Sequence, residues 1–128
     1  MNGPIAIFGE SQKGRFHYPY FCNSLYQLAD TFGEPPNDSL GLNLAIQAIM
    51  YERDIVFFRV SEEGFSIHDY MKGFEILKNK NKIKELCAIC LPKVGNHLIL
   101  DRVDPICKIH NSLIITTQTD LFDYLLSA

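Results

Sequence analysis

Short, continuous apolar segments alternate along this chain with longer segments whose apolar residues recur every three or four positions. The short segments cover residues 4–8, 54–60, 86–91 and 112–117, and they are rich in β-branched and aromatic side chains. Runs of this length and composition are typical of strands that are buried on both faces. The pattern therefore predicts four strands separated by helices.

Two helices are predicted between the first two strands. Over residues 18–32 the apolar positions have helical spacing, with Pro19 suited to the first turn and Gly33 to the end. Residues 39–50 form a second segment that is apolar on nearly every side. Such a helix is expected to lie between other elements rather than at the surface.

Helix-start signals place three further helices. Ser66 and Asp69 have the spacing of a capping box, in which each side chain binds a backbone N–H at the helix start. Asp104 followed by Pro105 predicts a short helix that reaches about His110. The last helix is predicted over residues 121–126.

Strands that alternate with helices predict a parallel sheet, because parallel strands need crossover connections and helices then cover both faces. We expect one α/β domain over residues 1–128. Its architecture is predicted to be a three-layer α/β/α sandwich with about four mostly parallel strands, Rossmann-like or flavodoxin-like.

Composition and charge limit the classes of molecule that the chain is expected to bind. The chain has 128 residues, 47% of them hydrophobic, with a net charge of −3 and a pI of about 5.7. An acidic chain without a basic cluster is not expected to bind nucleic acid or an anionic membrane. We see no signal peptide and no apolar run of membrane-spanning length. The four cysteines are interpreted as reduced thiols, so a cytoplasmic location is expected.

Ligands of open α/β sheets bind at the carboxyl ends of the strands. The loops at the carboxyl ends of the predicted strands cover residues 9–17, 61–64, 92–97 and 116–120. The first of these loops has about ten residues, whereas βα connections usually have two to six. A loop of this length is either a ligand-binding loop or a solvated connection.

The first loop carries groups that suit an anion. Gly9 and Gly14 have the spacing of the two P-loop glycines, but Arg15 stands where that motif requires lysine. A P-loop is therefore excluded, and a looser site for phosphate or carboxylate remains. The predicted ligand-binding residues are Gly9, Ser11, Lys13, Gly14, Arg15, Asn96 and Thr117.

Two adjacent carboxylates follow the second predicted strand. Glu62 and Glu63 could bind a ribose hydroxyl or act as a general base, and the alternative is a polar turn. His97 is the third predicted catalytic residue. His17 or His97 could also serve Ser11 as a base, although Ser11 lacks the flanking glycines of a nucleophile elbow.

No metal site and no cofactor are expected. Cys87 and Cys90 have a zinc-like spacing, but residues three apart on a strand face opposite sides and cannot share one ion. Both are predicted to be buried. Cys107 and His110 share one helix face, yet two ligands do not make a site.

Two hypotheses of function remain. The first is a module that binds a nucleotide-like or phosphorylated small molecule, with cleavage or transfer of an N-glycosidic bond as the reaction if it is an enzyme. The second is a non-catalytic interaction domain that self-associates. A homodimer would use Leu42, Ile46 and Ile49 or the aromatic residues 18–21.

Overall fold

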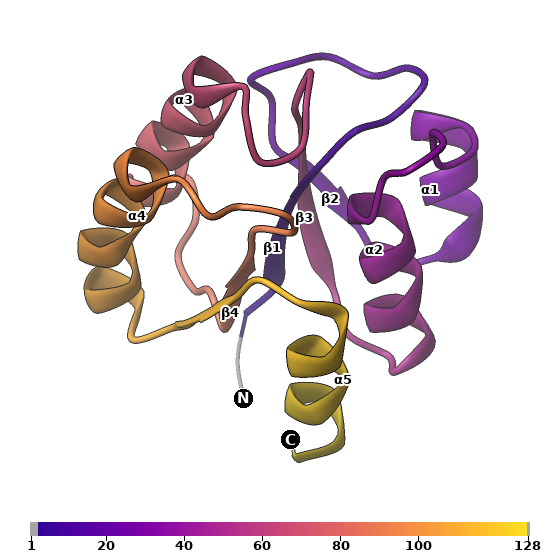
Figure 1. Cartoon of the computed structure of the whole chain (residues 1–128). Coiled ribbons are helices and arrows are strands. Elements are labelled where there is room, and N and C mark those ends of the chain that lie inside the picture. Colours follow the sequence, from indigo (N-terminus) through magenta and orange to yellow (C-terminus); the bar gives the residue numbers. More distant parts are fainter. Residues whose placement is uncertain (1–2, 128) are drawn as a thin grey trace.

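A five-stranded sheet lies at the centre of the computed structural model, which describes residues 3–127 (Figure 1). The elements in chain order are β1 (Ile5–Gly9), β2 (Tyr20–Cys22), α1 (Leu25–Phe32), α2 (Gly41–Met50), β3 (Ile55–Arg59), α3 (Ile67–Lys78), β4 (Ala88–Cys90), α4 (His97–His110), β5 (Leu113–Ile115) and α5 (Gln118–Ser127). The predicted α/β class is confirmed, with one strand more than expected.

The sheet has the order β2-β3-β1-β4-β5. Strand β1 pairs in parallel with β3 on one side and with β4 on the other, so Ile7 is opposite both Phe57 and Cys90. Only β2 is antiparallel. The parallel strands thus follow the order of flavodoxin-like sheets, with a topological switch point between β1 and β4.

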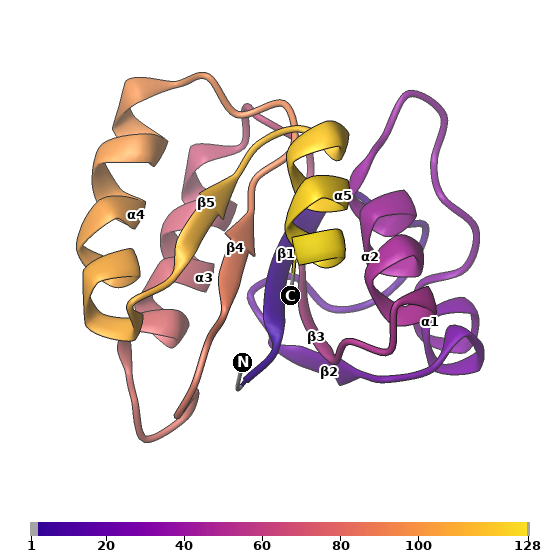
Figure 2. The same ribbon diagram turned by 90° about the horizontal axis from the view of Figure 1, so that it is seen from below.

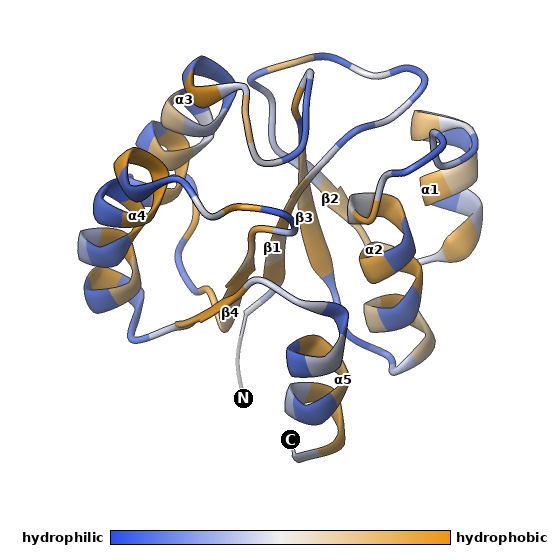
Figure 3. Cartoon of the chain, in the orientation of Figure 1, coloured by the Kyte–Doolittle hydropathy of each residue, from blue (hydrophilic) through white to orange (hydrophobic). Residues whose placement is uncertain are grey.

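Helices cover both faces of the sheet, which gives three layers (Figure 2). Alternate side chains of β1 divide between two cores: Ile5 and Ile7 pack under α1, α2 and α5, whereas Ala6 and Phe8 pack under α3 and α4. The strands are coloured as apolar along most of their length in Figure 3. This is the pattern expected of a sheet buried on both faces.

The first helix begins later than predicted. Ser24 has an extended backbone, and its side chain accepts a hydrogen bond from the Gln27 N–H at 3.2 Å, so α1 begins at Leu25. The preceding residues form β2, in which Tyr20 is opposite Phe57 of β3. Aromatic residues suit a strand, and pairing with β3 outweighs the helical spacing.

The fourth helix begins earlier than predicted. Asn96 is its N-cap, with the side-chain oxygen accepting from the Leu98 N–H at 2.8 Å. Pro105, predicted to open the helix, lies inside it. Ile99, Val103 and the rest of a buried stripe pack α4 into the core, which stabilises the helix despite the missing proline N–H.

Two glycines bring α2 against the end of β1. A Cβ atom on Gly41 would lie 2.5 Å from the Gly9 Cα, and one on Gly9 would lie 2.6 Å from the Gly41 Cα. Only hydrogen atoms fit at this contact. The start of α2 therefore lies directly at the carboxyl end of β1.

Candidate functional site

The β1–β2 loop, residues 10–19, extends over the carboxyl edge of the sheet from α1 to α3 (Figure 1). Its first attachment is the end of α1. The backbone N–H groups of Gln12 and Lys13 donate to the Phe32 carbonyl at 3.2 and 3.3 Å. The Gln12 side chain accepts from the Glu34 N–H at 3.0 Å. This part of the loop is therefore fixed by protein contacts.

Arg59, the last residue of β3, provides the second attachment. Its guanidinium donates to the carbonyls of Gly14 and Gln12 at 2.7 and 3.4 Å. The same group lies over the Phe16 ring, 4.2 Å from its centroid. Arg59 thus holds the middle of the loop by hydrogen bonds and a cation–π contact.

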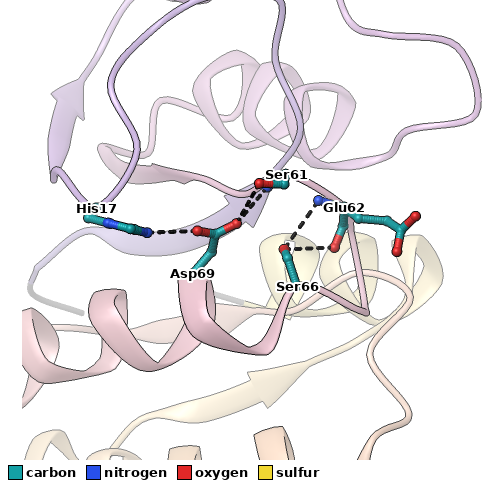
Figure 4. Close-up of polar contacts among 5 residues, drawn as sticks. All are labelled: His17, Ser61, Glu62, Ser66 and Asp69. Atoms are coloured by element: carbon teal, nitrogen blue, oxygen red, sulfur yellow. Dashed lines mark hydrogen bonds and ion pairs between the residues drawn. The ribbon is translucent and has the colours of Figure 1, made fainter.

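The third attachment joins the loop to α3. His17 Nε2 lies 2.7 Å from Asp69 Oδ1 (Figure 4). His17 has a left-handed backbone with φ of 60°, which is uncommon for a residue other than glycine. The carboxylate accepts, so Nε2 carries the proton and Nδ1 is left to exchange a proton with a bound molecule.

Asp69 is itself held by Ser61 at the end of β3. The Ser61 N–H and hydroxyl donate to Asp69 Oδ2 at 2.8 and 2.9 Å. Burial alone would raise the pKa of Asp69, but the hydrogen bonds from Ser61 and His17 outweigh it and lower that pKa. Asp69 is therefore a fixed carboxylate at the pH of most cells.

The capping box predicted at the start of α3 is wrong in its contacts. Ser66 is the N-cap residue, but its side chain makes no capping hydrogen bond to α3. Its hydroxyl instead contacts the N–H and carbonyl of Glu62 at 3.2 and 3.1 Å. Asp69 is consequently free to bind His17 and Ser61.

His17 is partly exposed to solvent and lies beside the ring of His68. The His17 side chain is 34% exposed. The exposed His68 ring stands nearly perpendicular to it, with centroids 5.2 Å apart. A molecule bound here would meet an imidazole whose orientation is fixed from behind by a carboxylate.

Glu63, a predicted catalytic residue, is 1% exposed and directed into the protein. Its carboxylate accepts from three backbone N–H groups: Glu10 at 2.8 Å, Leu40 at 2.8 Å and Gly41 at 2.9 Å. The Glu63 N–H in turn donates to the Glu10 carboxylate at 2.9 Å. Glu63 thus caps α2 and occupies the position where a ligand anion binds in many α/β folds.

Glu62, the neighbouring predicted residue, is exposed. Figure 4 shows its carboxylate directed away from the His17–Asp69 pair. Glu62 therefore stays a candidate for contact with a ligand hydroxyl, but it is not part of the pair.

The predicted anion-binding residues do not form one cluster. Ser11 is buried, and its hydroxyl donates to the Lys13 carbonyl at 2.8 Å. Lys13 and Arg15 are exposed, and the Arg15 guanidinium lies over the Tyr18 ring at 4.6 Å. The Arg15 N–H donates to the Tyr20 hydroxyl at 2.8 Å. Any anion bound here would depend on the two cationic side chains.

The remaining predicted residues lie at the starts of two helices. Asn96 caps α4, and the exposed His97 is its first residue. The Thr117 hydroxyl accepts from the Asp120 N–H at 3.1 Å at the start of α5. Asn96 and Thr117 thus have structural partners on their own helices.

The two thiols of the predicted zinc-like pair have different environments. Cys90 is fully buried in β4, as predicted. Cys87 precedes β4 and is only partly buried, so the prediction that both are buried is wrong for Cys87. Across residues 3–127 no group of three or more histidine, cysteine or acidic side chains could hold a metal ion.

A hollow lies at the opposite, amino edge of the sheet. It has a volume of about 510 Å³ and is lined by residues that include Phe21, Asn23, Asp54 and Glu85. Parallel sheets rarely bind ligands at this edge. Because the oriented histidine lies at the carboxyl edge, we take that edge as the candidate site.

Comparisons with known protein families, with curated proteins and with solved structures each gave no match. Among residues 3–127, no helix has the length and apolar character needed to cross a bilayer. The candidate site is therefore defined by the geometry of this chain alone.

Proposed function

We propose that this protein binds a nucleotide-like or phosphorylated small molecule at the carboxyl edge of its sheet, and that His17 transfers a proton to or from it. One observation carries the proposal: His17 is held by Asp69 at 2.7 Å at the end of a loop that covers this edge. A carboxylate behind an imidazole fixes its orientation and its tautomer. His17 and Asp69 are the proposed acid–base pair.

The backbone of His17 supports a role beyond structure. A left-handed conformation costs a residue other than glycine about 1–2 kcal/mol. His17 has this conformation, with φ of 60°, beside the Asp69 contact. Backbone strain of this kind is concentrated at functional sites.

The neighbouring side chains suggest the ligand. Lys13 and Arg15 extend into solvent from the same loop and suit a phosphate, while Phe16 offers a partly exposed aromatic ring. Glu62 adds an exposed carboxylate for a hydroxyl group. We propose hydrolysis of an N-glycosidic bond as the reaction, by analogy with other α/β folds. Water adds to the anomeric carbon as the C–N bond breaks, and doubly protonated His17 gives its Nδ1 proton to the leaving nitrogen. The proton that the added water releases restores His17.

Cys22, Cys90 and Cys107 are buried thiols outside any disulfide, which suits a reducing compartment. We therefore propose a cytoplasmic location.

A panel of nucleosides, nucleotides and sugar phosphates tests the proposal, with thermal shift for binding and release of free base for turnover. His17→Gln should keep ligand binding and lower turnover about 100-fold or more, the usual contribution of a general acid or base. Glu75→Gln on the exposed side of α3 is the control and should behave as wild type. Equal turnover by His17→Gln and wild type would refute the role of His17, and the absence of any ligand in the panel would refute the ligand class.

A further inference from the structure

The outer surface formed by α1, α2 and α5 is unusually apolar. These helices lie side by side on one face of the sheet, and α2 contacts both of the others (Figure 2). Large apolar side chains on this layer are between 40% and 79% exposed: Leu25, Tyr26, Met50, Tyr51, Phe122 and Leu126. On α3 and α4, by contrast, the exposed large apolar residues within the described chain are Leu98 and Ile109.

A groove lies between α1 and α2 on this surface. It has a volume of about 300 Å³, and Leu25, Leu28, Leu42 and Ile46 are among its lining residues. Leu28 and Leu42 form its buried floor, while Leu25 is 47% exposed. A hollow of this size and composition suits apolar side chains of a partner.

The charged residues within these three helices have one sign. Helices α1, α2 and α5 contain three charged residues, Asp30, Asp120 and Asp123, and no lysine, arginine or histidine. Helices α3 and α4 together contain four lysines or arginines and four acidic residues. Among the residues that line the groove, Glu34 is the charged one, so the groove carries an acidic side chain and no basic one.

The nearest cation in the sequence, Arg53, lies against α5 and does not line the groove. Arg53 follows α2, and its Nη2 lies 3.5 Å from the Tyr124 hydroxyl, with the guanidinium over the Tyr124 ring at 5.4 Å. A symmetric dimer through the groove would bring the acidic groove of one copy against that of the other, which is unfavourable. Charge complementarity favours a basic partner over a second copy.

We propose that the layer formed by α1, α2 and α5 binds an amphipathic helix whose polar face is basic. Apolar residues at helical spacing on the partner would enter the groove beside Leu25 and Ile46. Its lysines or arginines would lie near Glu34, which lines the groove, and near Asp30 of α1. This is recognition of a helix in a groove, on the layer remote from α3, which carries Asp69.

A labelled peptide tests the proposal through fluorescence anisotropy. The probe is a 14-residue leucine–lysine helix, and the controls are a peptide of the same composition without amphipathic order and a leucine–glutamate version. Wild type should bind the probe saturably and neither control. Leu25→Gln should weaken binding at least fivefold, and Asp30→Lys should weaken it and reduce its salt dependence. Leu98→Gln on α4 is the matched control and should bind as wild type.

Several results would overturn the proposal. Equal affinity of Leu25→Gln and Leu98→Gln would show that the groove is not the site. Equal binding of the glutamate peptide would remove the charge argument. A wild-type dimer in light scattering that Leu25→Gln dissociates would identify a second copy as the occupant, and vesicle binding that Leu25→Gln abolishes would identify a membrane.

Discussion

Replacing Glu63 with alanine should destabilise the protein strongly. The Glu63 carboxylate accepts three backbone N–H groups, from Glu10, Leu40 and Gly41, at 2.8 to 2.9 Å. Two of these donors belong to the start of α2, where Leu40 provides no side-chain cap. Alanine would remove the only acceptor that the structure places at all three N–H groups.

The expected loss follows from these contacts. A hydrogen bond to a charged group contributes about 1.5–3 kcal/mol, and three such bonds on one carboxylate are less than additive because water can enter the space left by the side chain. We expect Glu63→Ala to lose about 3–5 kcal/mol and Glu63→Gln somewhat less. For a domain of this size that loss corresponds to a decrease in Tm of roughly 10–20 °C.

Urea unfolding followed by circular dichroism measures the change. Glu62→Ala is the matched control, because it removes the same charge from the adjacent exposed position and should change the unfolding free energy by less than about 0.5 kcal/mol. If Glu63→Ala lost no more than Glu62→Ala, the conclusion that Glu63 caps α2 would be refuted.

Three further predictions concern other parts of the chain. Because the pKa of Asp69 is lowered, its contacts stabilise the fold fully above about pH 4 and are lost as the pH falls below that value. The free energy of urea unfolding should therefore decrease more between pH 6 and pH 3 for wild type than for Asp69→Asn, and an equal decrease would contradict this. Burial raises the pKa of Cys90 to about 12, so a thiol reagent should label Cys87 much faster than Cys90 under native conditions. Equal labelling rates would argue against the burial of β4. Gly41→Ala places a Cβ 2.5 Å from the backbone of β1 and should lower the free energy of urea unfolding by about 1–3 kcal/mol. A Cβ added at Gly95 would meet no atom within 4 Å, so Gly95→Ala should be nearly neutral. Similar losses of stability in the two variants would show that the close approach is absent.

The centre of the sheet could be predicted because β1, β3 and β4 are almost entirely buried. β1 and β3 appear in the sequence as unbroken apolar runs, and the helices between them then require parallel pairing. β2 could not be predicted in the same way. Its three residues precede a helix and have helical spacing, and their strand conformation depends on pairing with β3.

The location of the candidate site was predictable, but its central pair was not. Loop length and the strand-end rule indicated the segment that contains His17. The sequence pattern alone assigns Asp69 to a capping box, because Ser66 stands three residues before it. Its contact with His17 spans 52 positions, and no local pattern reports a contact between such distant segments.

The sequence alone does not distinguish the role of Glu63 from that of Glu62. Two adjacent glutamates after a strand have equal claims as catalytic residues when only the sequence is considered. In the structure Glu63 is buried against the start of α2, whereas Glu62 is exposed. The difference depends on the position of α2, which the close approach of Gly41 to β1 determines.

Chemical-shift mapping of the backbone amides with adenosine monophosphate is the decisive measurement for ligand binding at the carboxyl edge. The nucleotide carries both features of the proposed ligand, a phosphate and a nucleobase. We expect saturable shifts at His17, Ser61 and His68 on the carboxyl edge, and weaker shifts in Asp69→Asn. Shifts confined to Phe21 and the other residues around the hollow at the amino edge, or no saturable shifts at millimolar nucleotide, would show that the carboxyl edge is not the ligand site.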